Sequence, residues 1–250
     1  KEWLRLDSCH LELIFSSNLI SPLFKGFHNS YQSVRSELKN WYLLKVRFGL
    51  IIIYNDIRKQ LLKPRGQKME ITIFGKGNMG QAIGKNFADA GNDVQYYGSK
   101  DTAERLGNIV IMAVPYPALA ALAKQYQTKL AGKIVVDITN TLNFETFDEL
   151  VVPADSSAAQ QLQKLLPAST VLKAFNTTFA ATLQSGKIGD LPTTVLVAGD
   201  DEDAKETFKA ALADSALRVL DAGKLKRARE LESLGFLQLT LAASEKIGWD

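Results

Sequence analysis

The stretch Ile71-Thr-Ile-Phe-Gly75-Lys-Gly77-Asn-Met-Gly80 decides the fold of this chain. Its first four residues, all β-branched or aromatic, predict a buried strand, and residues 81–90 predict a helix. A strand, glycines spaced G-x-G-x-x-G and a helix together suit a dinucleotide pyrophosphate. Gly75 makes the tight turn, Gly77 lets the backbone approach the phosphates, and Gly80 lets the helix pack on the strand. The N–H groups of the first helical turn then face the anion, although such turns also occur in loops that bind nothing.

The composition is that of an ordinary globular protein, because 46% of the 250 residues are apolar and 23% are charged. The net charge of +3 is unevenly distributed. Residues 1–68 carry 12 Lys and Arg against 5 Asp and Glu, whereas residues 69–250 carry 18 against 22. The first methionine, Met69, lies at this boundary. The chain therefore divides into a basic segment and a slightly acidic one.

The basic segment, residues 1–68, has two interpretations: a membrane-surface or nucleic-acid-binding arm, or sequence upstream of a start at Met69. Its longest apolar run, residues 48–54, is too short to span a bilayer. We expect the second interpretation, with residues 1–68 as an extension outside the functional fold and no membrane or nucleic-acid partner. The single cysteine, Cys9, forms no disulfide framework, and with His10 alone it makes no metal site. We therefore expect a cytoplasmic protein without a bound metal.

Strands and helices are predicted to alternate from residue 69 onward. Apolar runs without polar alternation, such as residues 109–114, indicate strands buried on both faces. Strands are predicted over residues 71–74, 94–97, 109–114, 133–137, 171–175, 193–197 and 217–220, and helices over 81–90, 115–127, 156–166, 199–212 and 225–247. This order predicts an α/β fold of the Rossmann type. We expect a doubly wound, mostly parallel sheet with a small C-terminal α/β portion that ends in a long helix.

The last predicted helix carries leucines at helical spacing, namely Leu231, Leu234, Leu237 and Leu241. Such a stripe is typical of core packing or of a dimer seam. We interpret it in one of these two ways rather than as a ligand contact.

The tip of the second predicted strand favours NADP over NAD. An NAD enzyme places an acidic residue about 20 residues after the glycine loop, on the ribose 2′-hydroxyl. Ser99 and Lys100 occupy this position here, and both can donate hydrogen bonds to a dianionic 2′-phosphate. The alternative is a solvated Lys-Asp turn without a ligand.

Three predicted strands lead into short segments at their carboxyl ends. These segments are Ala113–Tyr116, Thr139–Asn140 and Asn176–Thr177. Because open α/β sheets bind ligands at the carboxyl ends of their strands, we expect the three segments to converge on one region.

These motifs resemble those of the NADPH-dependent coenzyme F-420 (deazaflavin) reductases. The resemblance covers about residues 69–250, in the order of the family's motifs, and does not touch residues 1–68. The matching motifs are Gly75-x-Gly-x-x-Gly80, Gly98-Ser-Lys100, Ala113-Val-Pro-Tyr116, Val136-Asp-Ile-Thr-Asn140, Lys173-Ala-Phe-Asn-Thr177, Val197-Ala-Gly-Asp-Asp201, Asp221-Ala-Gly223 and Ala228-Arg-Glu-Leu-Glu232.

The resemblance implies an NADP-binding Rossmann domain over residues 69–250, usually dimeric, with a short C-terminal portion on the acceptor side. It implies that the glycine loop holds the pyrophosphate and that Ser99 and Lys100 hold the 2′-phosphate. The cofactor-binding residues it implies are Gly75, Lys76, Gly77, Asn78, Met79, Gly80, Ser99, Lys100, Ala113, Val114, Pro115, Thr139 and Asn140. The substrate-binding residues it implies are Phe175, Asn176 and Thr177.

Two features depart from the family pattern. Only some ten residues separate Lys100 from the strand at Ile109, where the family has a helix and a strand. We therefore expect an edge strand to be missing and the adenine end of the site to be less enclosed. Residue 100 is Lys where Arg is usual, which gives a point charge instead of a planar fork.

The side chains available in residues 69–250 favour some classes of reaction over others. Residues 69–250 contain neither His nor Cys, and we assign no catalytic side chain. Carbonyl reduction needs a proton donor for the alkoxide, whereas hydride transfer to a flavin or deazaflavin needs little beyond the apposition of two rings. We therefore expect an NADP(H)-dependent oxidoreductase with a flavin- or deazaflavin-like co-substrate. Two alternatives stay open: an imine reductase like pyrroline-carboxylate reductase, which has a larger helical C-terminal domain, and a non-catalytic NADP(H)-sensing module.

Overall fold

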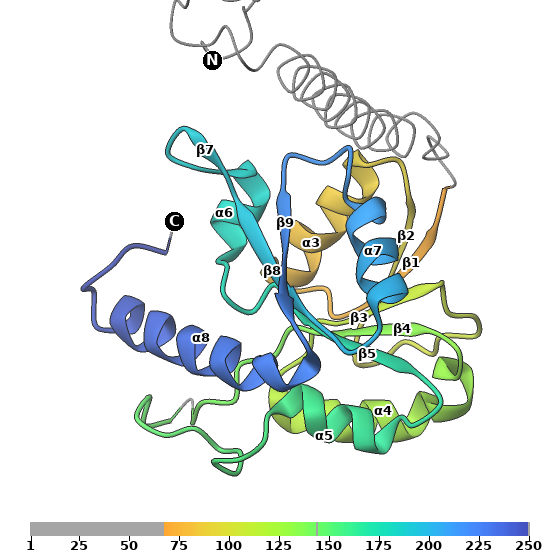
Figure 1. Cartoon of the computed structure of the whole chain (residues 1–250), viewed down its shortest axis with the longest axis horizontal. Helices are drawn as coiled ribbons and strands as arrows, with labels where there is room; N and C mark the ends of the chain where they lie inside the picture. Colours follow the sequence, from red (N-terminus) through yellow and green to blue (C-terminus); the bar gives the residue numbers. More distant parts are fainter. Residues whose placement is uncertain (1–67, 144, 250) are drawn as a thin grey trace, which may run out of the picture. The chain divides into compact units, whose positions relative to one another are not determined.

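The computed structural model describes residues 68–143 and 145–249 (Figure 1). The prediction that residues 1–68 form an extension outside the functional fold concerns residues that, except for Lys68, lie outside this part of the chain. It stays a prediction, and so does the interpretation of Cys9 and His10. Within the described residues, no helix has both the length and the apolar character needed to cross a membrane.

A mostly parallel sheet forms the centre of the fold. Within the described residues seven strands pair in the order β2-β1-β3-β4-β5-β8-β9, and neighbours are parallel except for β5 and β8. The strands are β1 Glu70–Phe74, β2 Asp93–Tyr97, β3 Ile109–Met112, β4 Ile134–Asp137, β5 Thr170–Ala174, β8 Thr194–Ala198 and β9 Arg218–Gly223. Each corresponds to a predicted strand, with ends that differ by a few residues.

Helices cover both faces of the sheet, so the doubly wound α/β prediction is confirmed (Figure 1). Buried apolar side chains form two clusters, one on each face. In the first cluster the rings of Phe87, Phe175 and Phe208 meet edge to face, with centroids 5.6 to 6.4 Å apart. One face carries α3 Asn78–Asp89, α6 Ala180–Ser185 and α7 Glu202–Ala211, and the other carries α4 Tyr116–Leu130 and α5 Ala158–Leu165.

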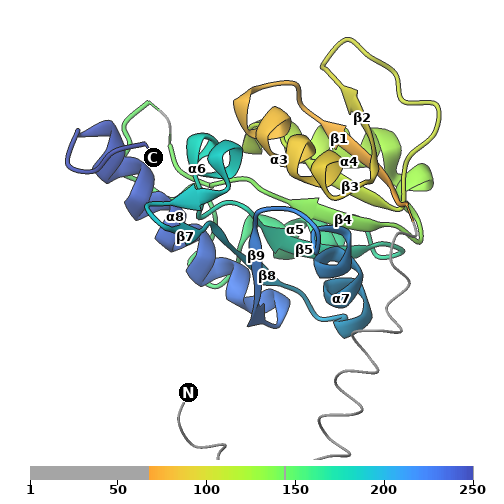
Figure 2. The ribbon, with the colours of Figure 1, turned by 90° about the horizontal axis from the view of Figure 1, so that it is seen from above.

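The long C-terminal helix is present but shorter than predicted. A 3₁₀ turn, Leu225–Arg227, precedes α8, which runs over Ala228–Ala243. The helix ends before residue 247 because the chain leaves it at Ser244 and Glu245 follows with a φ of +58°. Figures 1 and 2 show α8 extending past the sheet, on the side away from β2.

The leucine stripe of α8 is only partly explained by core packing. Leu231 is buried, but Leu234 and Leu237 are 43% and 53% exposed. The core-packing interpretation therefore holds for Leu231 and fails for Leu234 and Leu237.

A six-residue helix and a small hairpin were not anticipated. The hairpin consists of β6 Lys187–Ile188 and β7 Leu191–Pro192, and it follows α6 directly. Elements this short contain too few residues to produce a hydrophobic period, so the sequence gives no signal for them.

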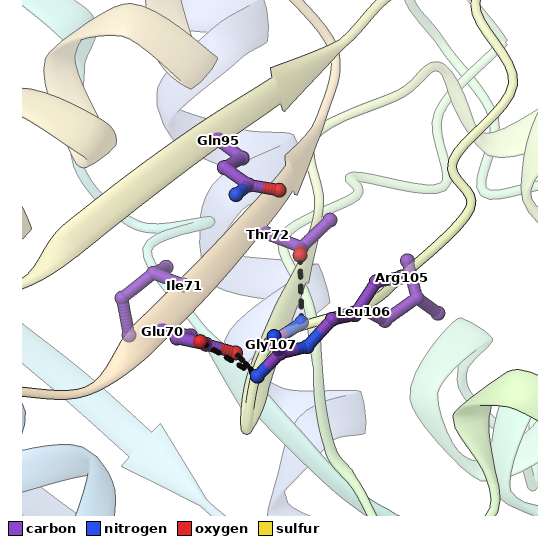
Figure 3. Close-up of a pocket in the computed structure, with 7 residues that line it drawn as sticks. All are labelled: Glu70, Ile71, Thr72, Gln95, Arg105, Leu106 and Gly107. Atoms are coloured by element: carbon purple, nitrogen blue, oxygen red, sulfur yellow. Dashed lines mark hydrogen bonds and ion pairs between the residues drawn. The ribbon is translucent and has the colours of Figure 1, made fainter.

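The loop between β2 and β3 takes the place of the helix and strand that the resemblance implies, and β2 is an edge strand, as predicted. Figure 3 shows how the loop is fixed: Arg105 donates to both Glu70 carboxylate oxygens at 2.7 Å, and the Gly107 N–H donates to Thr72 Oγ1 at 2.9 Å. The hollow there is about 30 Å³, which leaves room for only a few water molecules. It lies at the start of β1 and is too small for a nucleotide.

Candidate dinucleotide-binding site

The carboxyl ends of β1 and β3 mark where a ligand should bind. The chain passes outward from β1 to β2 and then returns to the other side of β1 as β3. The two strands therefore form the topological switch point of the sheet, where open α/β folds bind ligands. The glycine loop follows β1, and the Ala113–Pro115 segment follows β3.

The three glycines have the geometries that a pyrophosphate site requires. A Cβ on Gly75, whose φ is +119°, would lie 2.0 Å from the Ala113 carbonyl oxygen. A Cβ on Gly80 would lie 2.2 Å from the Gly75 carbonyl oxygen, whereas a Cβ on Gly77 would meet nothing within 4 Å. Gly75 and Gly80 thus allow close packing within the protein, and Gly77 leaves open space beside the backbone.

The first turn of α3 also fits an anion. Gly77 is the N-cap, no side chain caps the helix, and the first turn contains no acidic residue. The N–H groups at a helix start have no intrahelical partner, and the dipole adds a partial positive charge there. The open space at Gly77 and this uncapped helix together fit the pyrophosphate of NADP(H).

The turn after β2 is tied to the glycine loop. Asp101 forms an ion pair with Lys76 at 2.7 Å and accepts a hydrogen bond from the Gly98 N–H at 2.7 Å. The hydrogen bond from Lys76 and the Gly98 N–H hold the pKa of Asp101 below its usual value. Ser99 and Lys100 between them are exposed. Asp101 is therefore engaged within the protein, and the role of Ser99 and Lys100 toward a 2′-phosphate stays a prediction.

Two asparagines join the carboxyl ends of β4 and β5, as the convergence prediction requires. Asn140 Nδ2 donates to the Asn176 carbonyl at 2.9 Å, and Asn176 Nδ2 donates to Asn140 Oδ1 at 3.0 Å. Asn176 Nδ2 also donates to the Leu231 carbonyl of α8 at 2.8 Å. A Cβ on Gly235 would lie 2.2 Å from Asn140 Oδ1, so α8 packs directly on this pair.

Phe175 contributes differently from the prediction. Its side chain is 0% exposed and packs against Phe87 and Phe208, so the ring does not border an acceptor pocket. Its φ of +64° is unusual for a bulky residue, and the turn is held by the Thr178 N–H and hydroxyl, which both donate to the Phe175 carbonyl. Phe175 therefore contributes only its backbone to the turn that contains Asn176. Thr177, the next residue, is half-buried.

A buried ionic cluster beneath these strand ends was missed by the sequence analysis. Lys173 Nζ lies 2.8 Å from Asp137 Oδ2 and 2.9 Å from Glu232 Oε1, and all three residues are at most 1% exposed. Glu232 Oε2 also accepts from the Ala158 N–H at the start of α5, at 2.9 Å. The signal was present: a lysine inside the apolar run 171–175, and a glutamate in a mostly apolar helix, indicate a buried ion pair.

Two buried polar atoms at the same strand ends have no hydrogen-bond partner. They are the hydroxyl of Thr139 and the Oδ1 atom of Asn176, and within the described residues no other buried side-chain nitrogen or oxygen shares this state. Buried polar groups are normally paired, so an unpaired one calls for an explanation. Two of them at adjacent strand ends are consistent with a place prepared for a ligand.

A pocket of about 220 Å³ lies between the loop after β4 and the start of α8. Its lining is mixed, with Arg229 and Glu232 from α8 and apolar residues from the loop; the remaining residues are Leu150, Val152, Pro153, Ala154, Ser156 and Ser233.

Tyr116, at the start of α4, donates to Gln161 Oε1 at 2.9 Å. Burial and the negative charge of Glu232 raise the pKa of Tyr116, so this phenol keeps its proton.

The fold and the glycine loop define a dinucleotide-binding protein of the Rossmann type. No protein-family model matches the chain. Over 140 residues the chain is 33% identical to the F420-dependent NADP reductase of Methanocaldococcus jannaschii, which covers 54% of this chain and 62% of that protein. Over 126 residues it is 36% identical to the metalloreductase STEAP3 of Rattus norvegicus, covering 50% of this chain and 24% of that protein. The chain therefore spans less than two thirds of the length of these relatives.

A solved structure that is similar to this chain carries the same description as the first of these relatives. A protein from Arthrobacter sp. FB24, provisionally described as an F420-dependent NADP reductase, has a TM-score of 0.60 and 27% identity with this chain. The match covers 71% of this chain and 95% of that one. The resemblance expected from the sequence is thus confirmed: the chain is similar in sequence and in fold to NADP-dependent oxidoreductases. The roles of the individual site residues stay predictions.

Replacing Gly77 by alanine tests the pyrophosphate site. Because a Cβ at residue 77 would meet nothing in the protein, we expect the free energy of unfolding of the Gly77→Ala variant to stay within about 1 kcal/mol of the wild-type value. We expect its affinity for NADPH to fall by about tenfold or more, since the methyl group occupies the approach to the phosphates. Urea unfolding and calorimetric titration measure the two quantities.

The matched control is Gly75→Ala. Here the methyl group meets the Ala113 carbonyl and the φ is unfavourable, so stability itself should fall by about 1 to 3 kcal/mol. Unchanged NADPH affinity in the Gly77→Ala variant would contradict the assignment of the loop.

Proposed function

We propose that the protein is an NADP(H)-dependent oxidoreductase that transfers hydride between the nicotinamide and a flavin- or deazaflavin-like acceptor. The observation that carries this proposal is the glycine loop, open at Gly77 before an uncapped helix at the switch point of the sheet. The likeness to the F420-dependent NADP reductase of Methanocaldococcus jannaschii supports the acceptor class. The single cysteine, Cys9, supports a cytoplasmic location.

The chain's own residues would hold the cofactor at three places. The first turn of α3 would bind the pyrophosphate, and Ser99 with Lys100 would bind the 2′-phosphate. The Ala113–Pro115 segment, with Thr139 and Asn140, would border the nicotinamide. When bound, the cofactor would supply the hydride, and the protein's task is to orient the ring.

The side chains at the strand ends support the proposed acceptor class. Hydride transfer to a flavin-like ring requires no positioned acid, because its ring nitrogen can take a proton from solvent. Tyr116 is the ionisable side chain that begins α4 beside the nicotinamide segment, and its raised pKa makes it a weak proton donor. Asn140 and Asn176 carry no titratable group. This arrangement favours ring-to-ring transfer over the reduction of a carbonyl.

We also propose that the protein forms a homodimer through α8. From Ser233 to Ala243 the helix contains no charged residue, and Leu234 and Leu237 are 43% and 53% exposed. A helix that is apolar all round is normally buried. A second copy of the same helix would cover this surface with a partner of equal apolar character.

Turnover tests the proposed activity. We expect NADPH oxidation, followed at the nicotinamide absorbance, with flavins or a deazaflavin and not with a cyclic imine. Tight NADPH binding without turnover on any acceptor would favour the sensing module, and turnover on the imine alone would favour an imine reductase.

The Lys100→Ala variant tests cofactor choice. Losing a charge-assisted hydrogen bond to the 2′-phosphate should weaken NADPH binding by about tenfold to a hundredfold and leave NADH binding unchanged. Lys124→Ala, an exposed lysine of α4, is the matched control and should change neither affinity. Equal weakening of NADPH and NADH by Lys100→Ala would refute the phosphate role.

The Leu237→Lys variant tests the dimer. Placing charges at the centre of the apolar surface should convert a dimer into a monomer in sedimentation experiments, because the buried lysines would be unpaired. Ala120→Lys, at an exposed position of α4, should leave the dimer intact. A wild-type protein that sediments as a monomer would show the proposal to be wrong.

A further inference from the structure

The buried ionic cluster does more than pair charges. Besides its two carboxylates, Lys173 Nζ donates to the main-chain carbonyl of Thr139. Asp137 Oδ1 accepts from the Thr139 N–H at 2.8 Å. Both main-chain polar groups of Thr139, which lies two residues after the end of β4, are therefore held by the cluster.

The direction of this contact determines where the next N–H points. The Thr139 carbonyl and the Asn140 N–H belong to one planar peptide, in which they point in opposite directions. Because the carbonyl is directed at the fully buried Lys173, the Asn140 N–H is directed away from the cluster. Within the described residues this N–H makes no hydrogen bond, and Asn140 is partly exposed. It is thus an unused donor at the carboxyl end of β4.

The same cluster also fixes the side chain of Asn140, through α8. Glu232, the fifth residue of α8, anchors the helix to Lys173 and to the Ala158 N–H. Gly235, about one turn later, packs against Asn140 Oδ1. The backbone and the side chain of Asn140 are therefore both placed by residues of the cluster or of the helix that it anchors.

Stability alone does not account for such a cluster. Burying ions costs several kcal/mol each, and replacing a whole buried ion pair by neutral or apolar residues is often neutral or stabilising. Here two carboxylates share one lysine, and the remaining hydrogen bonds to Glu232 come from N–H groups at the start of α5 and from the Thr141 hydroxyl. The hydrogen bonds to Thr139 suggest that the cluster serves a geometric purpose.

We propose that Lys173, held by Asp137 and Glu232, is a positioning residue that orients the Thr139–Asn140 peptide so that the Asn140 N–H donates to a ring bound in the crevice. The inference rests on the proposed function, because the ring is that of the nicotinamide or of its acceptor. Lys173 itself touches no ligand. It acts through the peptide above it.

The test removes the cluster's charges together, so that no buried ion is left unpaired. In the variant Lys173→Met/Asp137→Asn/Glu232→Gln the amide at 137 can still accept from Thr139, but the bond to the Thr139 carbonyl is lost. We expect NADPH affinity to stay within about threefold of the wild type, because the glycine loop is untouched. We expect kcat to fall by about tenfold to a hundredfold, as for a small misplacement of a reacting ring.

Lys205→Met is the matched control. Lys205 is 4% exposed and pairs with Glu202 at 2.9 Å and Asp221 at 2.7 Å, so it too is a buried lysine with two carboxylates. It lies on α7, which packs on the face of the sheet opposite α5. We expect this variant to lose stability and to keep both its NADPH affinity and its kcat.

Hydrogen exchange gives a readout that does not depend on turnover. In the wild type, NADPH, or NADPH together with the acceptor, should protect the amides of Asn78, Met79 and Asn140. In the triple variant the first two should stay protected and Asn140 should lose its protection. Equal protection of Asn140 and equal kcat in both proteins would overturn the inference.

The wild-type exchange data also separate this inference from the proposed function. Protection at Asn78 and Met79 without protection at Asn140 would overturn the inference alone. The absence of protection at all three amides would overturn the proposed function, and the inference with it.

Discussion

The close approach of the turn after β1 to the start of the β3 loop is the constraint on which the site depends. A Cβ at Gly75 would lie 2.0 Å from the Ala113 carbonyl oxygen, so only glycine allows the two strand ends to meet. A glycine allows similarly close packing further along α3, where a Cβ on Gly84 would lie 1.9 Å from the Tyr96 hydroxyl. Three positions without side chains, Gly75, Gly80 and Gly84, thus hold the helix against β1 and β2. The start of α3 is directed into the crevice as a result.

The two ends of the crevice are supported by different means. Near β2 the support comes from surface contacts. These are the exposed ion pair between Lys76 and Asp101 and the loop between β2 and β3, which takes the place of a further strand. Near β4 and β5 it is deep, with a fully buried lysine, two asparagines and α8 locked together. This contrast agrees with the proposed reaction. The phosphates of the cofactor are bound mainly by charge, whereas the two reacting rings must be placed accurately relative to each other.

Much of this fold could be predicted from sequence because its signals are local. Apolar runs such as residues 109–114 reveal buried strands, and the glycine spacing places the turn and α3. The convergence of Asn140 and Asn176 followed from a rule about parallel strands. By contrast, the partners of Lys173 lie 36 and 59 residues away along the chain, on β4 and α8. Nothing local indicates which carboxylates a buried lysine will meet.

Other misses have a similar cause. The resemblance placed the turn at residues 175–177 beside the acceptor, but a left-handed φ turns the Phe175 ring into the core, and no sequence pattern indicates that conformation in a phenylalanine. The leucine spacing of α8 gave the helix correctly. It could not say that the sheet beneath ends after the first turns, leaving Leu234 and Leu237 uncovered.

Glu232 follows every strand of the central sheet along the chain, and this order has a consequence for biosynthesis. Domains fold as units while the chain emerges from its N-terminal end. Residues 69–224 contain every strand of the central sheet, yet the helix that supplies the second carboxylate to Lys173 follows them. A nascent chain can therefore assemble its strands and pair Lys173 with Asp137, but it completes the ligand-facing edge of the sheet only after α8 has been translated.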